Sequence, residues 1–138
     1  MRDWSGIVVH HSVSGDVPWS EIDRWHREQG WNKIGYHFVI RQNGFIEVGR
    51  SLKNQGAHAR FPSPSRNRTH VGIIWTGHGG EKPPTLSQVN SLAVLIGGLM
   101  DRFSIPWEKV EPHHEECPGR LFPWEAFRFK VDFMKQGR

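Results

Sequence analysis

Short apolar runs separated by turn residues predict the strands of this chain. The run Ile7–His10 is typical of a short buried strand. Residues Tyr36–Ile40 predict another strand, and Asn43-Gly44 predicts a tight turn from which Phe45–Val48 returns as a hairpin partner. The segment Val71–Thr76 is rich in β-branched side chains and is followed by glycine, which predicts a further strand. The pattern therefore predicts a small sheet built from segments far apart in the chain.

Three segments have the caps and the periodicity of helices. Ser20–Asp23 resembles a capping box, and it opens a helix that Gly30 ends. Thr85–Gln88 forms a second capping box, and the helix after it carries one apolar stripe: Val89, Leu92, Ala93, Ile96, Leu99 and Phe103. Pro123, at a first helical position, predicts a final helix. Helices alternating with strands predict an α/β fold, in which a central mixed β-sheet is flanked by helices.

Glycine and proline mark the irregular parts of the chain. Gly97 and Gly98 lie inside the long predicted helix, where each should cost about 1 kcal/mol relative to alanine. We expect this pair to permit close packing of the helix against the sheet. The segments 51–70 and 77–84 are rich in Pro, Gly and Ser, and we expect them to form exposed loops.

The composition is that of one globular domain. The chain has 138 residues, of which 36% are hydrophobic and 23% charged, and this is enough to bury one core. We therefore expect residues 1–138 to form a single domain. Seven Trp and eight Phe are many for this length, so some of them are expected to line a groove. No stretch approaches the roughly 20 apolar residues of a membrane span, and the first residues lack the apolar core of a signal peptide.

Two clusters of metal-binding side chains stand far apart in the sequence. His10 and His11 end the first predicted strand, and His113 and Cys117 lie in a late loop. Three nitrogen and sulfur ligands suit zinc, and a set of three leaves a fourth position for water. Cys117 is the only cysteine, so it cannot form an internal disulfide and is a candidate ligand or nucleophile. From these residues alone, a strand-end histidine bonded to backbone explains His10 equally well.

A series of motifs follows the order found in a known family. They are Trp25–Trp31, Ile34–Ile40, Asn43-Gly44, Gly49-Arg50, Gly56–Ala59, Val71–Ile73, Leu86–Gln88, His113–Glu115 and Cys117–Gly119. On these residues the chain resembles the zinc-dependent N-acetylmuramoyl-L-alanine amidases, which include phage amidase-lysozymes of the T-odd type and the peptidoglycan recognition proteins. The resemblance covers about residues 5–125 and is strongest to the short phage endolysins. It implies the fold shared by these amidases and recognition proteins.

The resemblance also implies a reaction and a set of ligands. The family hydrolyses the amide between the lactyl group of N-acetylmuramic acid and L-alanine of the stem peptide, using zinc-activated water. By their places in the motifs, His10, His113 and Cys117 are the implied ligands of one catalytic zinc ion. His11 and His114 are expected to be neighbours rather than ligands, because adjacent residues of a strand point to opposite faces.

Two further residues have implied roles at the cleft. Tyr36 stands at the position of the family's catalytic tyrosine, whose phenol orients the attacking water or donates to the oxyanion. The alternative for Tyr36 is a core aromatic on a strand. His58 matches a family histidine near the cleft, where it would bind the peptide or the glycan. The alternative for His58 is an exposed loop histidine.

The late loop departs from the family pattern. Phage relatives have a longer loop, with a lysine two positions before the cysteine that is assigned to the oxyanion. Here only three residues separate His113 from Cys117, and none is lysine. Glu115 stands in the lysine's place if the gap precedes it, and a carboxylate there could act only as a general base. Otherwise the lysine position is deleted, and Arg120 or His58 reaches the oxyanion, or Tyr36 and zinc suffice.

The predicted function is that of a monomeric endolysin whose partner is peptidoglycan. Without a signal peptide it would stay in the host cytoplasm until a holin or a lesion admits it to the periplasm. Without a separate wall-binding domain it would rely on its catalytic cleft for affinity. A cytoplasmic amidase that recycles anhydro-muropeptides and a non-catalytic module that binds muropeptides are the alternatives. Binding to a phage RNA polymerase, a property of some phage relatives, is neither favoured nor excluded.

Positive charge gathers in the loop after His58. The net charge is +4, and Arg60, Arg66 and Arg68 lie close together in that loop. We expect a basic surface that suits an anionic polymer, although a solvated charged loop explains these arginines equally well. Their spacing is not a nucleic-acid signature and no stacking motif accompanies them, so a nucleic acid is not an expected partner. A membrane is not an expected partner either.

Overall fold

A five-stranded sheet forms the centre of the protein in a computed structural model that describes residues 3–136. The strands are β1 (Gly6–His11), β2 (Phe38–Ile40), β3 (Ile46–Val48), β4 (His70–Trp75) and β5 (Val110–Pro112), in the order β3-β2-β4-β1-β5. Only β3 runs antiparallel to its neighbour, and the other pairs are parallel. The predicted mixed sheet is confirmed. Residues 1–2 and 137–138 of the predicted domain lie outside the described range.

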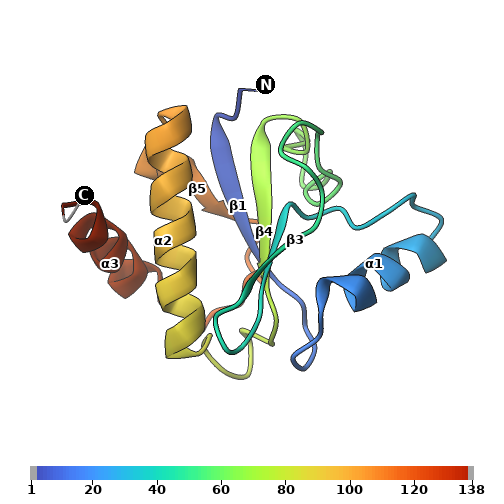
Figure 1. Ribbon diagram of the computed structural model, residues 1–138, viewed down its shortest axis with the longest axis horizontal. Coiled ribbons are helices and arrows are strands. Elements are labelled where there is room, and N and C mark those ends of the chain that lie inside the picture. Colours follow the sequence, from blue (N-terminus) through green and yellow to red (C-terminus); the bar gives the residue numbers. More distant parts are fainter. Residues whose placement is uncertain (1–2, 137–138) are drawn as a thin grey trace.

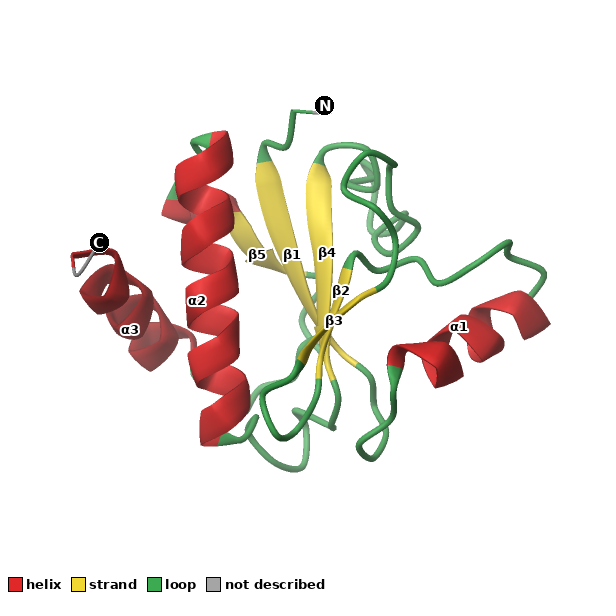
Figure 2. Cartoon of the chain, in the orientation of Figure 1, coloured by secondary structure: helices red, strands yellow, loops and turns green. Residues whose placement is uncertain are grey.

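The helices cover the two faces of this sheet unequally. Helices α2 (Leu86–Phe103) and α3 (Trp124–Gln136) pack together on one side, and α1 (Trp19–Glu28) lies alone on the other (Figures 1 and 2). A short 3-10 turn, η1 (Trp107–Lys109), leads into β5. Within residues 3–136, no helix has the length and apolar character needed to cross a membrane. This arrangement confirms the predicted α/β class with helices on both faces.

The core is divided between the two faces in the same unequal way. The larger cluster fills the side under α2 and α3 and includes Ile7, Val9, Ile73, Trp75, Leu92, Ile96 and Phe127. The smaller cluster under α1 consists of Ile22, Ile34, Val39 and Ile74. Because side chains alternate along a strand, Ile7 and Val9 of β1 enter the larger cluster and His10 faces the other side. The thinly covered face is therefore the one that holds His10.

The two predicted capping boxes have different outcomes. The one at Thr85 is confirmed: its Oγ1 accepts from the Gln88 N–H at 3.1 Å, and the Gln88 side chain accepts from the Thr85 N–H at 2.9 Å. The one at Ser20 is wrong, because α1 begins at Trp19 and its N-cap is Pro18, which makes no side-chain cap bond. Proline suits this place, since its fixed φ and missing N–H cost nothing at a helix start.

The strands near the site differ from prediction in length and number. β2 begins at Phe38, so Tyr36 and His37 lie just before the strand rather than in it. β5 was not predicted, because three residues ending in Pro112 carry no apolar run. It is an edge strand that pairs only with β1, where proline is tolerated.

Gly98 offers a test of the packing of α2. It is exposed, and a Cβ added there would meet nothing within 4 Å, so the expected close packing against the sheet is wrong for this glycine. Gly98→Ala should stabilise the protein by about 0.5–1 kcal/mol, because alanine has the higher helix propensity. Urea unfolding measures this change. Gly30→Ala is the matched control, since Gly30 has equally open space but a φ of +95°. It should destabilise, and an unchanged or lower stability of Gly98→Ala would contradict the explanation.

Candidate metal centre and active-site cleft

Three potential ligands converge at the thinly covered face of the sheet. One ligand atom each from His10, His113 and Cys117 lies within 4.8 Å of the others. The Sγ atom of Cys117 lies 3.7 Å from Nδ1 of His10. The topology explains this meeting, because β1 and β5 are parallel neighbours and each places a histidine at or just beyond its carboxyl end. Residues more than 100 positions apart thereby form one cluster.

A chain of hydrogen bonds fixes which nitrogen of His10 faces the cluster. Nε2 of His58 donates to the carbonyl of His70 at 2.9 Å, since a carbonyl can only accept. Burial lowers the pKa of His58 to about 3, so the ring is neutral and its Nδ1 must accept. Nε2 of His10 therefore donates to His58 Nδ1 at 2.9 Å. The unprotonated Nδ1 of His10 is left facing Cys117, as a metal ligand requires.

The other two candidate ligands are held by backbone groups. Nε2 of His113 donates to the carbonyl of Phe61 at 2.6 Å, which leaves its Nδ1 as the free lone pair. Burial raises the pKa of the Cys117 thiol to about 11, and a hydrogen bond from the backbone N–H of His11 acts in the opposite direction. His113 N–H donates to the Cys117 carbonyl at 2.9 Å, so both candidate ligands belong to one tight hairpin.

The donor set fits a zinc ion. Two imidazole nitrogens and one sulfur are ligands that Zn²⁺ accepts, and tetrahedral bonds of about 2.0–2.3 Å place two donors about 3.5 Å apart. The 3.7 Å between Cys117 Sγ and His10 Nδ1 is close to this spacing. Burial also lowers the pKa of His10 and of His113, which keeps both rings neutral and able to bind a metal.

An open cleft of about 930 Å³ borders the cluster. It is lined by Trp31, Tyr36, Ala57, His58, Arg60, Phe61, Pro62, Asn67, His113 and His114. The ring of Tyr36 lies 4.9 Å from that of His10, centroid to centroid. Burial raises the pKa of Tyr36 above its ordinary value, so the phenol stays protonated and can donate a hydrogen bond. The cleft thus combines a candidate metal centre with a protonated phenol that can donate a hydrogen bond.

Comparison with known proteins decides the family. A family model described as N-acetylmuramoyl-L-alanine amidase matches residues 1–120. The chain belongs to this amidase family. The endolysin of Klebsiella phage KP32 is 40% identical to the amidase over 125 residues, which cover 85% of this chain and 79% of the relative.

Solved structures agree with this assignment. The amidase is similar to N-acetylmuramoyl-L-alanine amidase LysC from Clostridium intestinale, with a TM-score of 0.85, 35% identity and coverage of 95% of this chain and 87% of that one. It also resembles a point mutant of Drosophila PGRP-LB in complex with tracheal cytotoxin, with a TM-score of 0.74 and 27% identity over 91% of this chain and 81% of that one. Hydrolysis of the N-acetylmuramoyl–L-alanine amide of peptidoglycan is therefore the activity of this chain.

The histidines next to the cluster have other partners in the amidase. His11 turns toward the opposite side, where its Nδ1 accepts from the N–H of Gly79 at 2.8 Å. His114 Nδ1 accepts from the N–H of Glu116 at 3.2 Å. His58 is buried and both of its ring nitrogens are engaged, so only the edge of its ring is available to a substrate. Gly72 makes room for it, because a Cβ there would lie 2.5 Å from the His58 ring.

The candidates for the role of the missing lysine divide into two groups, of which Tyr36 and His58 line the cleft. Neither Glu115 nor Arg120 is among its lining residues, and Glu115 instead lines a neighbouring hollow that His113 also borders. Arg60 is exposed, and it is the one arginine among the described residues that line the cleft. No pattern in the sequence distinguishes it from the other arginines of its loop.

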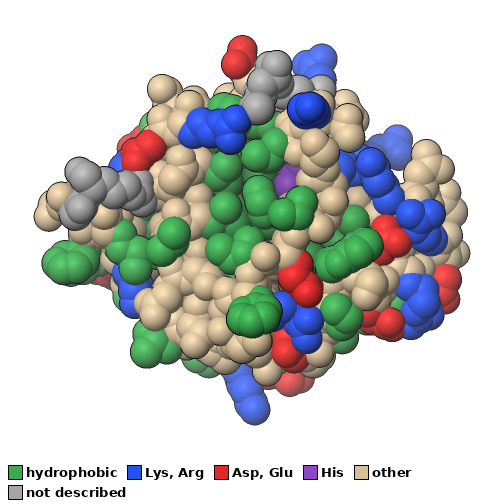
Figure 3. Space-filling view, in the orientation of Figure 1, with side chains coloured by type: hydrophobic (Ala, Val, Ile, Leu, Met, Phe, Trp, Pro, Cys, Tyr) green, Lys and Arg blue, Asp and Glu red, His purple; other side chains and the backbone are tan. Residues whose placement is uncertain are grey.

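The expected basic surface is smaller than the sequence suggested. Arg66 does not contribute to it, because its guanidinium is turned inward to Glu111. On α1, to the right in Figure 3, basic and acidic side chains intermingle. Arg24 there pairs with Glu21 and Glu28, and Arg27 pairs with Asp23. Positive charge on that helix is therefore largely neutralised.

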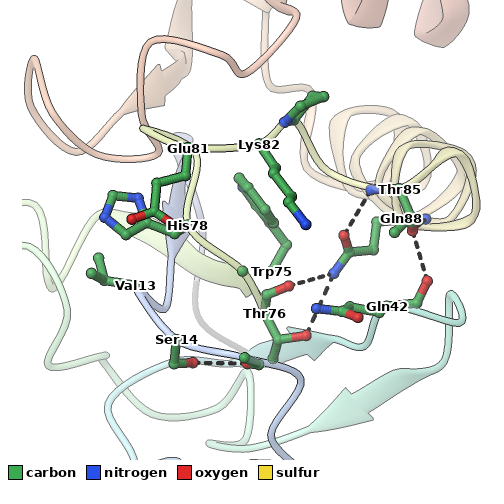
Figure 4. Close-up of a pocket in the computed structure, with 13 residues that line it drawn as sticks. Val13, Ser14, Gln42, Trp75, Thr76, His78, Glu81, Lys82, Thr85 and Gln88 are labelled. Atoms are coloured by element: carbon green, nitrogen blue, oxygen red, sulfur yellow. Dashed lines mark hydrogen bonds between the residues drawn. The ribbon is translucent and has the colours of Figure 1, made fainter.

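A second hollow of about 540 Å³ lies at the ends of β1 and β4 (Figure 4). The side chain of Gln88 lines this hollow and donates to the carbonyls of Ile40 at 3.1 Å and Thr76 at 2.9 Å. Its lining residues include none of the candidate ligands of the amidase. The Gln88 side chain therefore connects α2 to the ends of β2 and β4.

Proposed function

We propose that the chain is a zinc-dependent endolysin, in which His10, His113 and Cys117 hold one catalytic zinc ion. The observation that carries the proposal is the convergence of these donors, each oriented by its own hydrogen-bond partner, at the edge of the cleft. When bound, the ion lowers the pKa of water toward about 7 and polarises the substrate carbonyl. Three protein ligands leave the open position that this chemistry needs.

In this proposal Tyr36 is the catalytic proton donor. An amide carbonyl gains negative charge as a nucleophile attacks, and a fixed neutral donor stabilises that charge. The burial of Tyr36 supplies such a donor, since the raised pKa prevents ionisation at neutral pH. His58 orients His10, and its own contact with the peptide or glycan, through the ring edge in the cleft, stays a prediction.

The biological role is inferred from the relatives. The similar proteins of Klebsiella phage KP32 and Escherichia phage T7 are named endolysins. We infer that this chain degrades peptidoglycan during phage lysis, as a single catalytic domain that reaches the periplasm through a holin or a lesion. The PGRP-LB mutant structure contains tracheal cytotoxin, which supports a muropeptide as the occupant of the cleft.

The test is the mass of the product released from purified meso-diaminopimelate murein. Metal-chelated protein and zinc-restored protein are compared in parallel. The proposal predicts free stem peptide beginning with L-alanine, only from the zinc-restored sample. Zinc binding together with murein binding, but without any release of peptide, would instead mean a recognition module.

Phe61 provides a separate test of the cleft. Phe61 is 67% exposed and lines the cleft, whereas its carbonyl accepts from His113. Phe61→Ala removes the ring and keeps the carbonyl, so we expect KM for murein fragments to rise about 5- to 30-fold, the equivalent of 1–2 kcal/mol of lost apolar contact. Zinc affinity should stay within twofold of wild type. Steady-state kinetics on a soluble muropeptide measures the effect, and an unchanged KM would remove Phe61 from the binding surface.

A further inference from the structure

One arginine connects the loop after His58 to the segment that carries His113. Nη1 of Arg66 donates to Oε1 of Glu111 at 2.9 Å and to the carbonyl of Pro112 at 3.0 Å. Its Nη2 donates to the carbonyl of His113 at 2.5 Å. The side chain is only 16% exposed. A largely buried guanidinium that bonds two successive carbonyls fixes the path of the backbone between them.

The same loop orients two of the three candidate ligands. It carries His58, whose ring accepts from His10, and Phe61, whose carbonyl accepts from the ring of His113. The loop is closed on itself, since the Arg66 N–H donates to the Ala59 carbonyl at 2.9 Å. The side chain of Asn67 also accepts from the N–H groups of His58 and Ala59, at 2.8 and 2.7 Å. The loop that carries His58 and Phe61 is therefore internally hydrogen-bonded, and the Arg66 side chain connects it to the backbone of His113.

The contacts of Arg66 with the backbone of Pro112 and His113 matter because the late loop is short. Only three residues lie between His113 and Cys117, and a backbone hydrogen bond joins these two residues directly. A shift of the His113 backbone would move the Cys117 sulfur as well. It would also separate the ring of His113 from the Phe61 carbonyl. Loss of the Arg66 contacts should therefore disturb two ligands at once.

We propose that Arg66 is a positioning residue of the metal centre, which sets the place of His113 and Cys117 relative to His10. This inference rests on the proposed zinc site. Arg66 does not touch the metal ligand atoms, and it acts through the backbone carbonyls of Pro112 and His113. The partner groups that orient metal ligands typically contribute 10- to 100-fold to metal affinity.

The experiment measures zinc affinity of the full chain by competition with a chelating indicator. Arg66→Gln should bind zinc about 10- to 100-fold more weakly than wild type. Arg66→Lys should lie between the two, because one ammonium on a flexible stem lacks the planar fork that reaches both carbonyls. The visible spectrum of the Co²⁺-substituted proteins gives a second readout, in which Arg66→Gln should show an altered ligand field. If Arg66→Gln does not fold, Arg66→Lys alone decides.

Arg41→Gln is the matched control. Arg41 is also a half-buried arginine, 23% exposed, and it pairs with Asp16 at 3.0 Å and Glu47 at 3.4 Å away from the cluster. Its loss should lower stability and leave zinc affinity within twofold of wild type. Zinc affinity of Arg66→Gln within twofold of wild type, or an equal loss in Arg41→Gln, would overturn the positioning role. A wild-type protein that binds no zinc would overturn the proposed zinc site itself, and the two failures are therefore distinguishable.

Discussion

His10→Ala should abolish stoichiometric zinc binding and lower kcat/KM for the muramoyl amide by at least about a thousandfold. The substitution removes one of three ligands, and two donors do not hold a catalytic ion at micromolar zinc. It also removes the imidazole whose Nε2 donates to His58, so a buried acceptor is left without its partner. Metal content after dialysis and hydrolysis of a soluble muropeptide measure the two effects.

His11→Ala is the matched control for His10→Ala. His11 is equally part of the strand-end pair, but its ring accepts from Gly79 and its backbone N–H, which bonds to Cys117, survives the substitution. We expect full zinc content and a loss of stability of about 1–3 kcal/mol, from the unsatisfied Gly79 N–H. The opposite pattern, with zinc lost in His11→Ala and kept in His10→Ala, would show that the ligand assignment is reversed.

Tyr36→Phe should lower kcat by about 100- to 1000-fold, which is the usual cost of removing one donor to a developing oxyanion. The substitution deletes only the hydroxyl and keeps the ring beside His10. Zinc content and KM should therefore remain near the wild-type values. Single-turnover kinetics on a muropeptide separates the chemical step from binding.

The result for Tyr36 also bears on the missing lysine. A large loss of kcat would mean that the phenol, with the ion, provides the stabilisation of the oxyanion in this chain. A loss smaller than about threefold would mean that another donor has this role. Arg60 would then be the first candidate, because it lines the cleft and Glu115 and Arg120 do not.

Much of the fold could be predicted because it depends on local patterns. The apolar runs, the Thr85 capping box and the Asn43-Gly44 turn each have a direct physical meaning in sequence. β5 could not be predicted in this way, since it owes its existence to pairing with β1 rather than to its own side chains. The start of α1 at Trp19 was also missed. In the sequence Ser20 resembles an N-cap, whereas the structure has Pro18 at that position.

The residues of the candidate metal site could be predicted from the sequence, whereas the groups that orient them could not. His10, His113 and Cys117 have side chains with recognisable metal chemistry and matched a family order. The groups that orient them are mostly backbone atoms, such as the Phe61 carbonyl and the N–H of His11, which have no signature in sequence. In the sequence Arg66 resembles an exposed charged residue. Its contacts with the carbonyls of Pro112 and His113 show instead that it is bonded within the protein.

The most direct test of the zinc-dependent mechanism is a titration of metal-free protein with zinc, followed by the rate of stem-peptide release from a soluble muropeptide. We expect no activity before zinc is added, a linear rise of the rate with added zinc and a plateau at one equivalent per chain. Activity that is independent of zinc, or a protein that binds one equivalent and releases no peptide, would show that the zinc-dependent mechanism is wrong.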